Sequence, residues 1–284
     1  MDLPMTATVP TENEYNQICQ LVYQYSRIHL GSDKRELVAA RLGKRLRATG
    51  ITTYREYCQL LKSPGGSDEI GNLVDVISTN HTFFFRESKH FEYLESVVVP
   101  GFRREAWGKG ETCLRCWSAA SSSGEEPYSI AMSLASFADR HPGFFWELDA
   151  SDICTKVLET ARIGIYPSDR INSVPFELQR RFFQKGVGVH SGDYRVKEEL
   201  RSRIRWHHLN LFQESYPFQN RFHIIFCRNV MIYFDRPSQE LLIRRLASQL
   251  VPGGYLFIGH SESLSGVTHA LQALKPAIYR KPLK

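Results

Sequence analysis

The sequence lacks any run of ~18 or more uncharged apolar residues, the length that a helix needs to cross a bilayer. Its opening residues, MDLPMTATVPTENEY, have neither a basic start nor an apolar core. We therefore expect a short flexible lead-in instead of a signal peptide, and no membrane insertion.

Cysteine is scarce, with six in 284 residues. Only Cys113 and Cys116 form a CxxC pair, and no second pair stands at zinc-ligand spacing. The pair lies where a strand is expected to run into a loop, which favours ordinary half-buried thiols. We predict no metal site, and the scattered thiols indicate a reducing cytoplasm.

Two catalytic signatures are also missing. No GxGxxG dinucleotide fingerprint occurs, and no Ser-His-Asp or Cys-His set is apparent. The segment GHSES (259–263) ends in serine where a nucleophile elbow has glycine. These absences argue against a dinucleotide loop and against a hydrolase.

The sequence does hold enough apolar material for a large core, at 42% hydrophobic and 12% aromatic residues, which excludes disorder. The net charge is +6, which raises the question of a nucleic-acid partner. Residues 1–84 nevertheless balance nine Lys/Arg with nine Asp/Glu. Within them the segment 34–47 holds six Lys/Arg against Glu36 alone. The positive charge of this region is concentrated in one short segment.

Residues 12–84 show apolar positions at helical spacing with short breaks between them. Ser32 or Asp33 is expected to cap a helix that ends near Gly50, and another apolar helix is expected from about 70 to 77. We therefore predict an all-α N-terminal domain over residues 1–84.

A charged linker is expected at 85–110, and from residue 111 to 284 short apolar runs alternate with helical stretches. This alternation predicts an α/β fold with a mostly parallel sheet covered on both faces. Ligands bind such sheets at the carboxyl ends of the strands. The expected strands are 113–118, 144–150, 222–227 and 255–259 (after a turn at 252–254), and the expected helices are 128–139 and 238–250.

Small or polar residues follow these strands. The stretch 117–129, WSAASSSGEEPYS, lets the backbone approach a ligand and leads into a helix N-terminus, although a plain helix cap explains it equally well. Asp152 can accept hydrogen bonds from a ribose or cap the next helix. The segments HLNL (208–211) and CRNVMIYF (227–234) offer further polar groups, with an ordinary loop and a structural turn as the alternatives.

Together with NHTFFFR (80–86), ASD (150–152) and GGYLFIGHSE (253–262), these segments resemble the chemotaxis receptor methyltransferases. The matches stand in order over nearly the whole chain, and Ser121 is a departure, since the family commonly has Cys or Ala there. The resemblance implies a Rossmann-like class I methyltransferase domain with a small antiparallel β subdomain at about 165–205. It also implies S-adenosyl-L-methionine as the cofactor and receptor glutamate side chains as the methyl acceptors.

The resemblance implies roles for particular residues. Arg86 and Tyr233 would face the reacting methyl group and the incoming carboxylate. That carboxylate is ionised near pH 7 and is itself the nucleophile, so no general base is needed. Glu125 is an alternative to Glu126 in the cofactor site. The implied cofactor-binding residues are Asn80, Thr82, Arg86, Glu126, Asp152, Asn210, Leu211, Arg228 and Asn229.

Two surfaces are implied to hold the receptor. The basic helix, with Arg41, Lys44 and Arg45, resembles the family's contact for the acidic methylation region, and a merely solvated helix face is the alternative. The segment 185–192, KGVGVHSG, resembles the glycine loop of members that dock a receptor's C-terminal pentapeptide. An exposed strand edge captures such a peptide by β-augmentation, and a plain hairpin is the alternative. The glycines of this loop are Gly186, Gly188 and Gly192.

One alternative is a class I methyltransferase acting on nucleic acid, a small molecule or another protein. The absence of an Asn/Asp-Pro-Pro-aromatic element and the confinement of the basic residues disfavour nucleic acid. A non-catalytic adaptor is disfavoured because Arg86, Asp152, Asn229 and Tyr233 are all retained. We expect a cytoplasmic monomer whose partners are the cytoplasmic domains of chemoreceptors, with no nucleic-acid partner.

Overall fold

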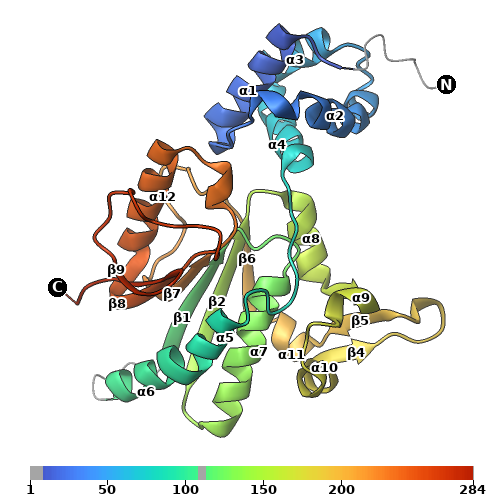
Figure 1. The fold of residues 1–284 in the computed structure, drawn as a ribbon. Coiled ribbons are helices and arrows are strands. Elements are labelled where there is room, and N and C mark those ends of the chain that lie inside the picture. The colour runs from blue at the N-terminus through green and yellow to red at the C-terminus, as the bar shows by residue number, and fades with distance from the viewer. Residues whose placement is uncertain (1–8, 108–112, 284) are drawn as a thin grey trace.

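The computed structural model describes residues 9–107 and 113–283, and it places a helical unit above a larger α/β unit (Figure 1). The all-α N-terminal domain predicted from the sequence is confirmed. Its elements are α1 (Glu12–Ser26), the 3₁₀ helix η1 (Ser32–Lys34), α2 (Arg35–Thr49), α3 (Tyr54–Lys62) and α4 (Gly66–Ile77).

The helix ends follow from their sequence. Thr11 caps α1 in a reciprocal capping box with Glu14. Gly50 ends α2 in the left-handed conformation, at φ 71°. The expected cap at Ser32 or Asp33 is wrong, because both residues lie in η1, which runs directly into α2.

The segment expected as a linker, 85–110, is helical from residue 89 to 107. It forms α5 (Lys89–Tyr93), a π-helical turn η2 (Leu94–Val98) and α6 (Val99–Trp107). Phe91, Leu94 and Val98 are buried in the core of the α/β unit. This segment therefore packs as part of the α/β unit. Its many charged residues led to the prediction of a linker, because composition alone does not show which positions are buried.

A seven-stranded sheet organises the α/β unit, in the order β6-β2-β1-β7-β8-β10-β9. The neighbours from β6 to β8 run parallel, and β10 pairs antiparallel with β8 and β9. The turn expected at 252–254 lies inside β8, as a local irregularity in its pairing with β7. The strands are β1 (Cys113–Ala119), β2 (Phe145–Asp152), β6 (Ile204–His208), β7 (Phe222–Cys227), β8 (Leu250–Phe257), β9 (Gln272–Lys275) and β10 (Ile278–Arg280).

Helices cover both faces of this sheet, as the near-continuous apolar strands require. Along β7, Ile224 and Phe226 join the cluster that contains α7, whereas Ile225 and Cys227 join the cluster that contains α12. This alternation is the two-residue period of a strand with a core on each side. The covering helices are α7 (Glu125–Arg140), α8 (Thr155–Ile163) and α12 (Arg236–Gln249).

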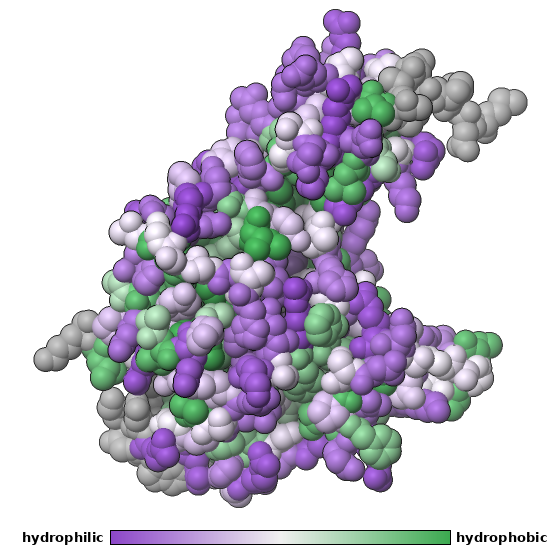
Figure 2. All heavy atoms as spheres, viewed as in Figure 1, coloured by the Kyte–Doolittle hydropathy of each residue, from purple (hydrophilic) through white to green (hydrophobic). Residues whose placement is uncertain are grey.

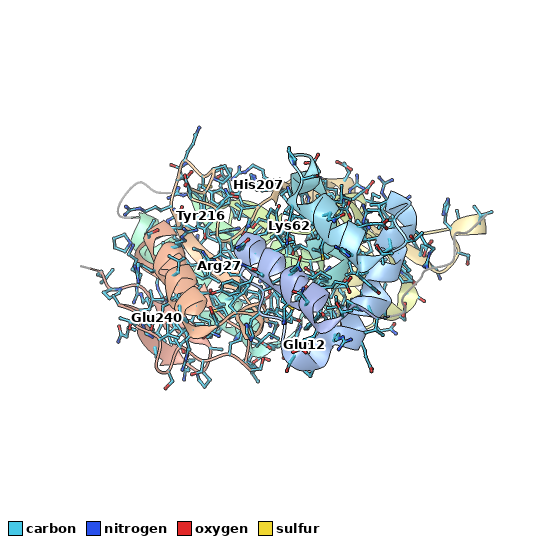
Figure 3. The ribbon with its side chains drawn as sticks, turned by 90° about the horizontal axis from the view of Figure 1, so that it is seen from above. Glu12, Arg27, Lys62, His207, Tyr216 and Glu240 are labelled. Atoms are coloured by element: carbon cyan, nitrogen blue, oxygen red, sulfur yellow. The ribbon has the colours of Figure 1, made fainter. Side chains whose placement is uncertain are left out.

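Between α8 and β6 the chain forms a small antiparallel sheet in the order β3-β5-β4. This is the subdomain expected at about 165–205, and it projects to the side away from α12 (Figures 1 and 3). Val187 and Val189, 81% and 96% exposed, lie in the β4–β5 connection, where Figure 2 shows green at the projecting tip. The elements are β3 (Ile165–Pro167), α9 (Ser168–Ile171), α10 (Phe176–Phe182), β4 (Phe183–Lys185), η3 (Gly188–His190), β5 (Asp193–Val196) and α11 (Glu198–Arg201).

The two thiols of the CxxC pair do not lie side by side. Cys113 and Cys116 both lie in β1, and residues three apart in a strand point to opposite faces. In the part of the chain that the structure describes, none of the helices combines the length and the apolar character needed to span a bilayer.

Candidate active site

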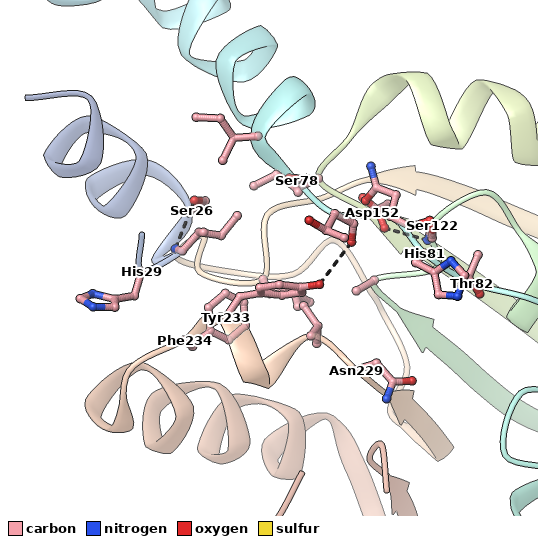
Figure 4. A pocket seen from close by; sticks show the side chains of 18 of the residues that line it. Ser26, His29, Ser78, His81, Thr82, Ser122, Asp152, Asn229, Tyr233 and Phe234 are labelled. Carbon is pink, nitrogen blue, oxygen red and sulfur yellow. Dashed lines mark hydrogen bonds between the residues drawn. The ribbon is translucent and has the colours of Figure 1, made fainter. Parts of the chain in front are cut away.

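A pocket lies at the carboxyl ends of β1, β2 and β7, between the α/β unit and the helical unit (Figure 4). Its wall includes the segment that connects the two units, residues 78–86, which we call the crossover segment. It also includes residues of α1, α2 and the loops after the strands. The pocket brings together Asn80, Thr82, Arg86, Glu126, Asp152, Asn210, Leu211, Arg228, Asn229 and Tyr233, which are all the residues implied for the cofactor and the chemistry.

Asp152 ends β2, and its carboxylate holds two loops. Oδ2 accepts a hydrogen bond from the backbone N–H of Ser122 at 2.8 Å, and Oδ1 accepts one from that of Cys154 at 2.9 Å. Burial raises the pKa of Asp152 to about 6, and nearby Asp75 adds to the effect. At the start of the following helix, Asp75 reaches across from α4 and accepts hydrogen bonds from the Thr155 hydroxyl at 2.8 Å and from the Thr155 backbone N–H at 3.3 Å. Asp152 lines the pocket, and the N-cap residue of α8 is Cys154 and not Asp152.

The loop after β1 is tightly bent around the pocket. Gly124 has φ 99°, and a Cβ there would lie 2.8 Å from both the Ala161 Cβ and the Tyr166 hydroxyl. Only glycine fits such a position. Strained backbone tends to collect at functional sites. Of the seven non-glycine residues with positive φ in the described chain, six line the pocket or stand next to a lining residue in the sequence: Arg27, Phe85, Glu87, Ala120, Ser122 and Asn229.

The structure separates the two adjacent carboxylates at the start of α7. Glu126 lines the pocket and accepts hydrogen bonds from the Ser118 hydroxyl at 2.7 Å and from Arg228 at 3.0 Å. Glu125 is fully buried and is held instead by Ser123 at 2.7 Å and Arg170 at 3.1 Å. Burial raises the pKa of both carboxyls. Of the two, Glu126 is the cofactor-site candidate.

Arg228 follows β7 and fastens the crossover segment to the sheet. Its buried guanidinium donates to Glu126, to the Glu87 carboxylate at 2.9 Å and to the carbonyl oxygen of Arg86 at 2.5 Å. Burial alone would raise the pKa of Glu87, but Arg228 outweighs it and the pKa falls to about 2. Glu87 was not predicted as a site residue, because an acidic residue in a charged segment gives no signal of burial.

Glu262 supports Asn229 from behind. Its carboxylate accepts hydrogen bonds from the backbone N–H groups of Gly259 at 2.6 Å, Met231 at 2.7 Å and Asn229 at 2.9 Å. A Cβ on Gly259 would lie only 2.3 Å from the Asn229 side-chain nitrogen. The segment GGYLFIGHSE therefore shapes the pocket without lining it, a role that sequence analysis did not assign.

Glu87, His90 and His260 bring three possible metal-ligand atoms within 4.8 Å of one another. The Glu87 carboxylate is already paired with Arg228. Burial and the same arginine lower the pKa of His90 to about 3. A cation here would compete with the Arg228 guanidinium, so we interpret the cluster as the ion pair of Glu87 and Arg228 with the uncharged His90 beside it.

Arg86 and Tyr233 are both partly exposed in the pocket wall. The Arg86 guanidinium lies over the Phe83 ring, 5.7 Å from its centroid, and donates to the His81 carbonyl oxygen at 3.1 Å. The Tyr233 hydroxyl lies 3.5 Å from the Thr79 carbonyl oxygen (Figure 4). The Arg86 bond has an ordinary length, whereas the Tyr233 bond is long and therefore weak.

Asn210 closes the pocket on the side of the helical unit. Its side-chain nitrogen donates to the Tyr25 carbonyl oxygen at 2.6 Å, and its oxygen accepts from the Phe212 N–H at 2.9 Å. Across the pocket, the Asn80 carbonyl oxygen accepts from the Ser122 hydroxyl at 3.0 Å. Both residues thus join the two units around the pocket.

The expected receptor-binding cations on α2 have different surroundings. Arg41 lines the pocket and donates to the carbonyl oxygens of Ile77 and Ser78 at the end of α4. Arg45 pairs with Glu69, where the two side chains are 17% and 9% exposed. Of the three residues implied for the receptor, Lys44 alone is exposed. Glu69 of α4 holds Arg45, whereas the carbonyl oxygens at the C-terminal end of α4 hold Arg41.

The glycines implied for peptide docking lie in the subdomain, outside the pocket. Gly188 and Gly192 have φ values of 60° and 99°, and a Cβ on Gly186 would lie 2.1 Å from the His190 carbonyl oxygen. These glycines allow the chain to fold back sharply between β4 and β5. The role in docking stays a prediction.

A family model described as the SAM binding domain of CheR methyltransferase matches residues 80–279, and that of its all-alpha domain matches residues 13–78. The chain belongs to the CheR methyltransferase family. It is 43% identical to the chemotaxis protein methyltransferase of Escherichia coli, over 90% of this chain and 86% of that one. The Borreliella burgdorferi protein of that name is 38% identical over 95% of each chain, and that of Salmonella typhimurium 40% over 95% and 90%.

The cofactor of this CheR methyltransferase is S-adenosyl-L-methionine, and the pocket fits it chemically. The molecule carries a sulfonium and an ammonium group, and the pocket presents the buried carboxylate of Asp152 and the partly exposed carboxylate of Glu126. Hydroxyl donors of a ribose match the carboxylate oxygens of Asp152. The prediction of the cofactor and the Rossmann-like fold is confirmed, whereas the residue assignments stay predictions.

Proposed function

We propose that the protein transfers a methyl group from S-adenosyl-L-methionine to glutamate side chains of chemoreceptors in the cytoplasm. The products are glutamate methyl esters and S-adenosyl-L-homocysteine. The observation that carries the proposal is the presence of Arg86 and Tyr233 in the same pocket wall as Asp152 and Glu126. The names of the relatives, chemotaxis protein methyltransferases, support the substrate class.

The main task of the protein in this reaction is to position the substrate carboxylate and the methyl group. The bound cofactor supplies an electrophilic methyl group, and a carboxylate oxygen of the substrate forms the new bond as the carbon–sulfur bond breaks. Arg86 orients the carboxylate through a forked hydrogen bond, and Tyr233 lines the path of the methyl group. Holding oxygen, carbon and sulfur in line then provides most of the rate acceleration.

Transfer of a labelled methyl group to chemoreceptor-containing membranes tests this proposal. We expect a base-labile label on the receptor band, which is the behaviour of a carboxyl methyl ester. Asp152→Ala is the matched control, since it removes a cofactor contact and should abolish labelling. A base-stable label would assign another acceptor atom. Cofactor binding without any receptor label would favour a different acceptor, such as another protein or a small molecule.

We propose that the exposed cations of α2 contact the acidic methylation region of the receptor. With Arg41 and Arg45 turned inward, the exposed positions are Lys44 and Arg47. Reversing both to Glu should raise the KM for receptor several-fold and leave cofactor affinity unchanged. Arg55→Glu, at an exposed position on α3, is the control. Equal receptor kinetics in all three proteins would exclude this contact.

We also propose that the small sheet docks the C-terminal pentapeptide of a receptor. β4 is an edge strand of the order β3-β5-β4, and the exposed Val187 and Val189 follow it. An added strand would gain main-chain hydrogen bonds at this edge and apolar contacts at the tip. Calorimetric titration with receptor pentapeptides tests it, and absence of heat with every peptide would exclude docking.

A further inference from the structure

Arg170 connects the small subdomain to the cofactor pocket. It lies in α9, and its Nη1 atom donates to the carbonyl oxygen of Thr82 at 2.9 Å and to Glu125 Oε1 at 3.1 Å. Thr82 belongs to the crossover segment and lines the pocket. Glu125 opens α7 immediately before Glu126. One side chain of the subdomain therefore reaches two parts of the pocket that are distant in sequence.

Neighbouring contacts make this connection continuous. The buried hydroxyl of Tyr166, in β3, donates to the Ser123 carbonyl oxygen at 2.6 Å. At the other end of α9, the backbone N–H of Ser168 donates to the Gly192 carbonyl oxygen at 2.8 Å. Hydrogen bonds thus link the connection between β4 and β5 to α9, and α9 to the crossover segment and the start of α7, while β3 is bonded to the loop after β1.

Of the two acceptors of Arg170, the buried Glu125 carboxylate is stabilised by a cationic donor, whereas the Thr82 carbonyl oxygen needs only a hydrogen-bond donor. The Glu125 side chain is 0% exposed, whereas the Arg170 side chain is 41% exposed and extends from the surface to Glu125. Removing the partner of a buried carboxylate leaves it uncompensated and favours rearrangement around it. The Thr82 carbonyl oxygen would lose its donor at the same time. The crossover segment would then be held less firmly over the pocket.

We propose that Arg170 is a positioning residue, which holds Thr82 and the crossover segment in place for cofactor binding. The subdomain then serves the cofactor site as well as the receptor. This inference rests on the proposed contact between Thr82 and the cofactor. Arg170 is not among the residues that line the pocket, and it acts through the carbonyl oxygen of Thr82.

The test compares Arg170→Ala, Arg170→Lys and Arg181→Ala. Arg181 is the matched control, because it lies in the same subdomain, is 45% exposed and also pairs with an acidic residue, Asp139. We expect Arg170→Ala to weaken S-adenosylmethionine binding about tenfold in calorimetry, the effect of losing a charge-assisted hydrogen bond. Arg170→Lys should recover part of this affinity, and Arg181→Ala should match the wild type.

Receptor methylation assays give the second readout. Arg170→Ala should raise the KM for S-adenosylmethionine and leave kcat within about twofold at saturating cofactor, because the chemical step is untouched. Wild-type affinity in Arg170→Ala, or a fall in kcat with unchanged KM, would overturn the proposal. If Arg170→Ala does not fold, Arg170→Lys decides by the same criterion. Failure of the wild type to bind S-adenosylmethionine would instead overturn the assignment of the pocket.

Discussion

The backbone N–H of Ser122 donates to Oδ2 of Asp152 at 2.8 Å and joins the loop after β1 to the end of β2. The bond places a buried carboxylate between two loops that face the pocket. Because burial raises the pKa of Asp152 to about 6, this carboxyl titrates just below neutral pH in the unliganded protein. Cofactor binding and folding stability should respond to this titration with opposite signs.

We expect S-adenosylmethionine affinity to fall about tenfold between pH 7 and pH 5, since the ionised carboxylate binds ribose hydroxyls better than the protonated one. Calorimetry over this range measures it. Asp152→Asn should bind weakly with a flatter profile, and a flat wild-type profile would contradict the assignment. The sign for folding is reversed. The raised pKa stabilises the unliganded protein below the unfolded value, ~3.9, and this contribution disappears as the pH rises through about 6.

Arg45 and Lys44 are neighbours in sequence whose substitutions should differ sharply in effect. Arg45 forms a largely buried pair with Glu69, which also accepts from the Tyr57 hydroxyl at 2.7 Å. Arg45→Ala should lower the free energy of unfolding by about 3 kcal/mol, because it leaves a carboxylate without its cation. Lys44→Ala, at an exposed position, should change it by less than ~0.5 kcal/mol. Urea denaturation distinguishes them, and equal midpoints would show that the Arg45 pair contributes nothing.

Substitutions at Arg86 and at Tyr233 should lower kcat/KM by different amounts. Arg86→Ala should lower kcat/KM for receptor about 100-fold, the loss typical of a donor that positions a reacting group. Arg86→Lys should not restore it, because an ammonium cannot form the forked pair. Tyr233→Phe should cost only a few-fold, since the hydroxyl makes one long hydrogen bond at 3.5 Å in the structure. Wild-type kinetics in both Arg86→Ala and Tyr233→Phe would refute these roles.

The parts of this fold that could be predicted from the sequence are those with local signals. The β7 strand was predicted at its observed bounds, because five of its six buried residues are apolar and His223 is the one exception. The polar residues at the strand ends could be placed in one pocket because parallel strands bring their carboxyl ends to the same edge. The roles within the pocket came from the family resemblance.

The remaining features depend on contacts between distant segments, which have no local signature. Glu87 and Glu262 are ordinary acidic residues in the sequence, and only the fold surrounds them with Arg228 or with backbone N–H groups. From the sequence alone Arg45 is likewise expected to be a surface cation. In the fold, α4 places Glu69 beside it. The helices at 89–107 were missed for a similar reason, since charge along their exposed side outweighed Phe91, Leu94 and Val98.

Gly259 and Gly101 offer a matched pair for testing the support behind Asn229. A Cβ on Gly259 would lie 2.3 Å from the Asn229 side-chain nitrogen and 2.9 Å from its backbone nitrogen, whereas one on Gly101 would meet nothing within 4 Å. Gly259→Ala should cost about 1–3 kcal/mol of stability through overpacking and weaken cofactor binding by displacing Asn229. Gly101→Ala, in the helix α6, should be neutral or stabilise by up to ~1 kcal/mol. Thermal denaturation and calorimetry measure both effects. Unchanged cofactor affinity in Gly259→Ala would mean that the position of Asn229 does not matter for binding.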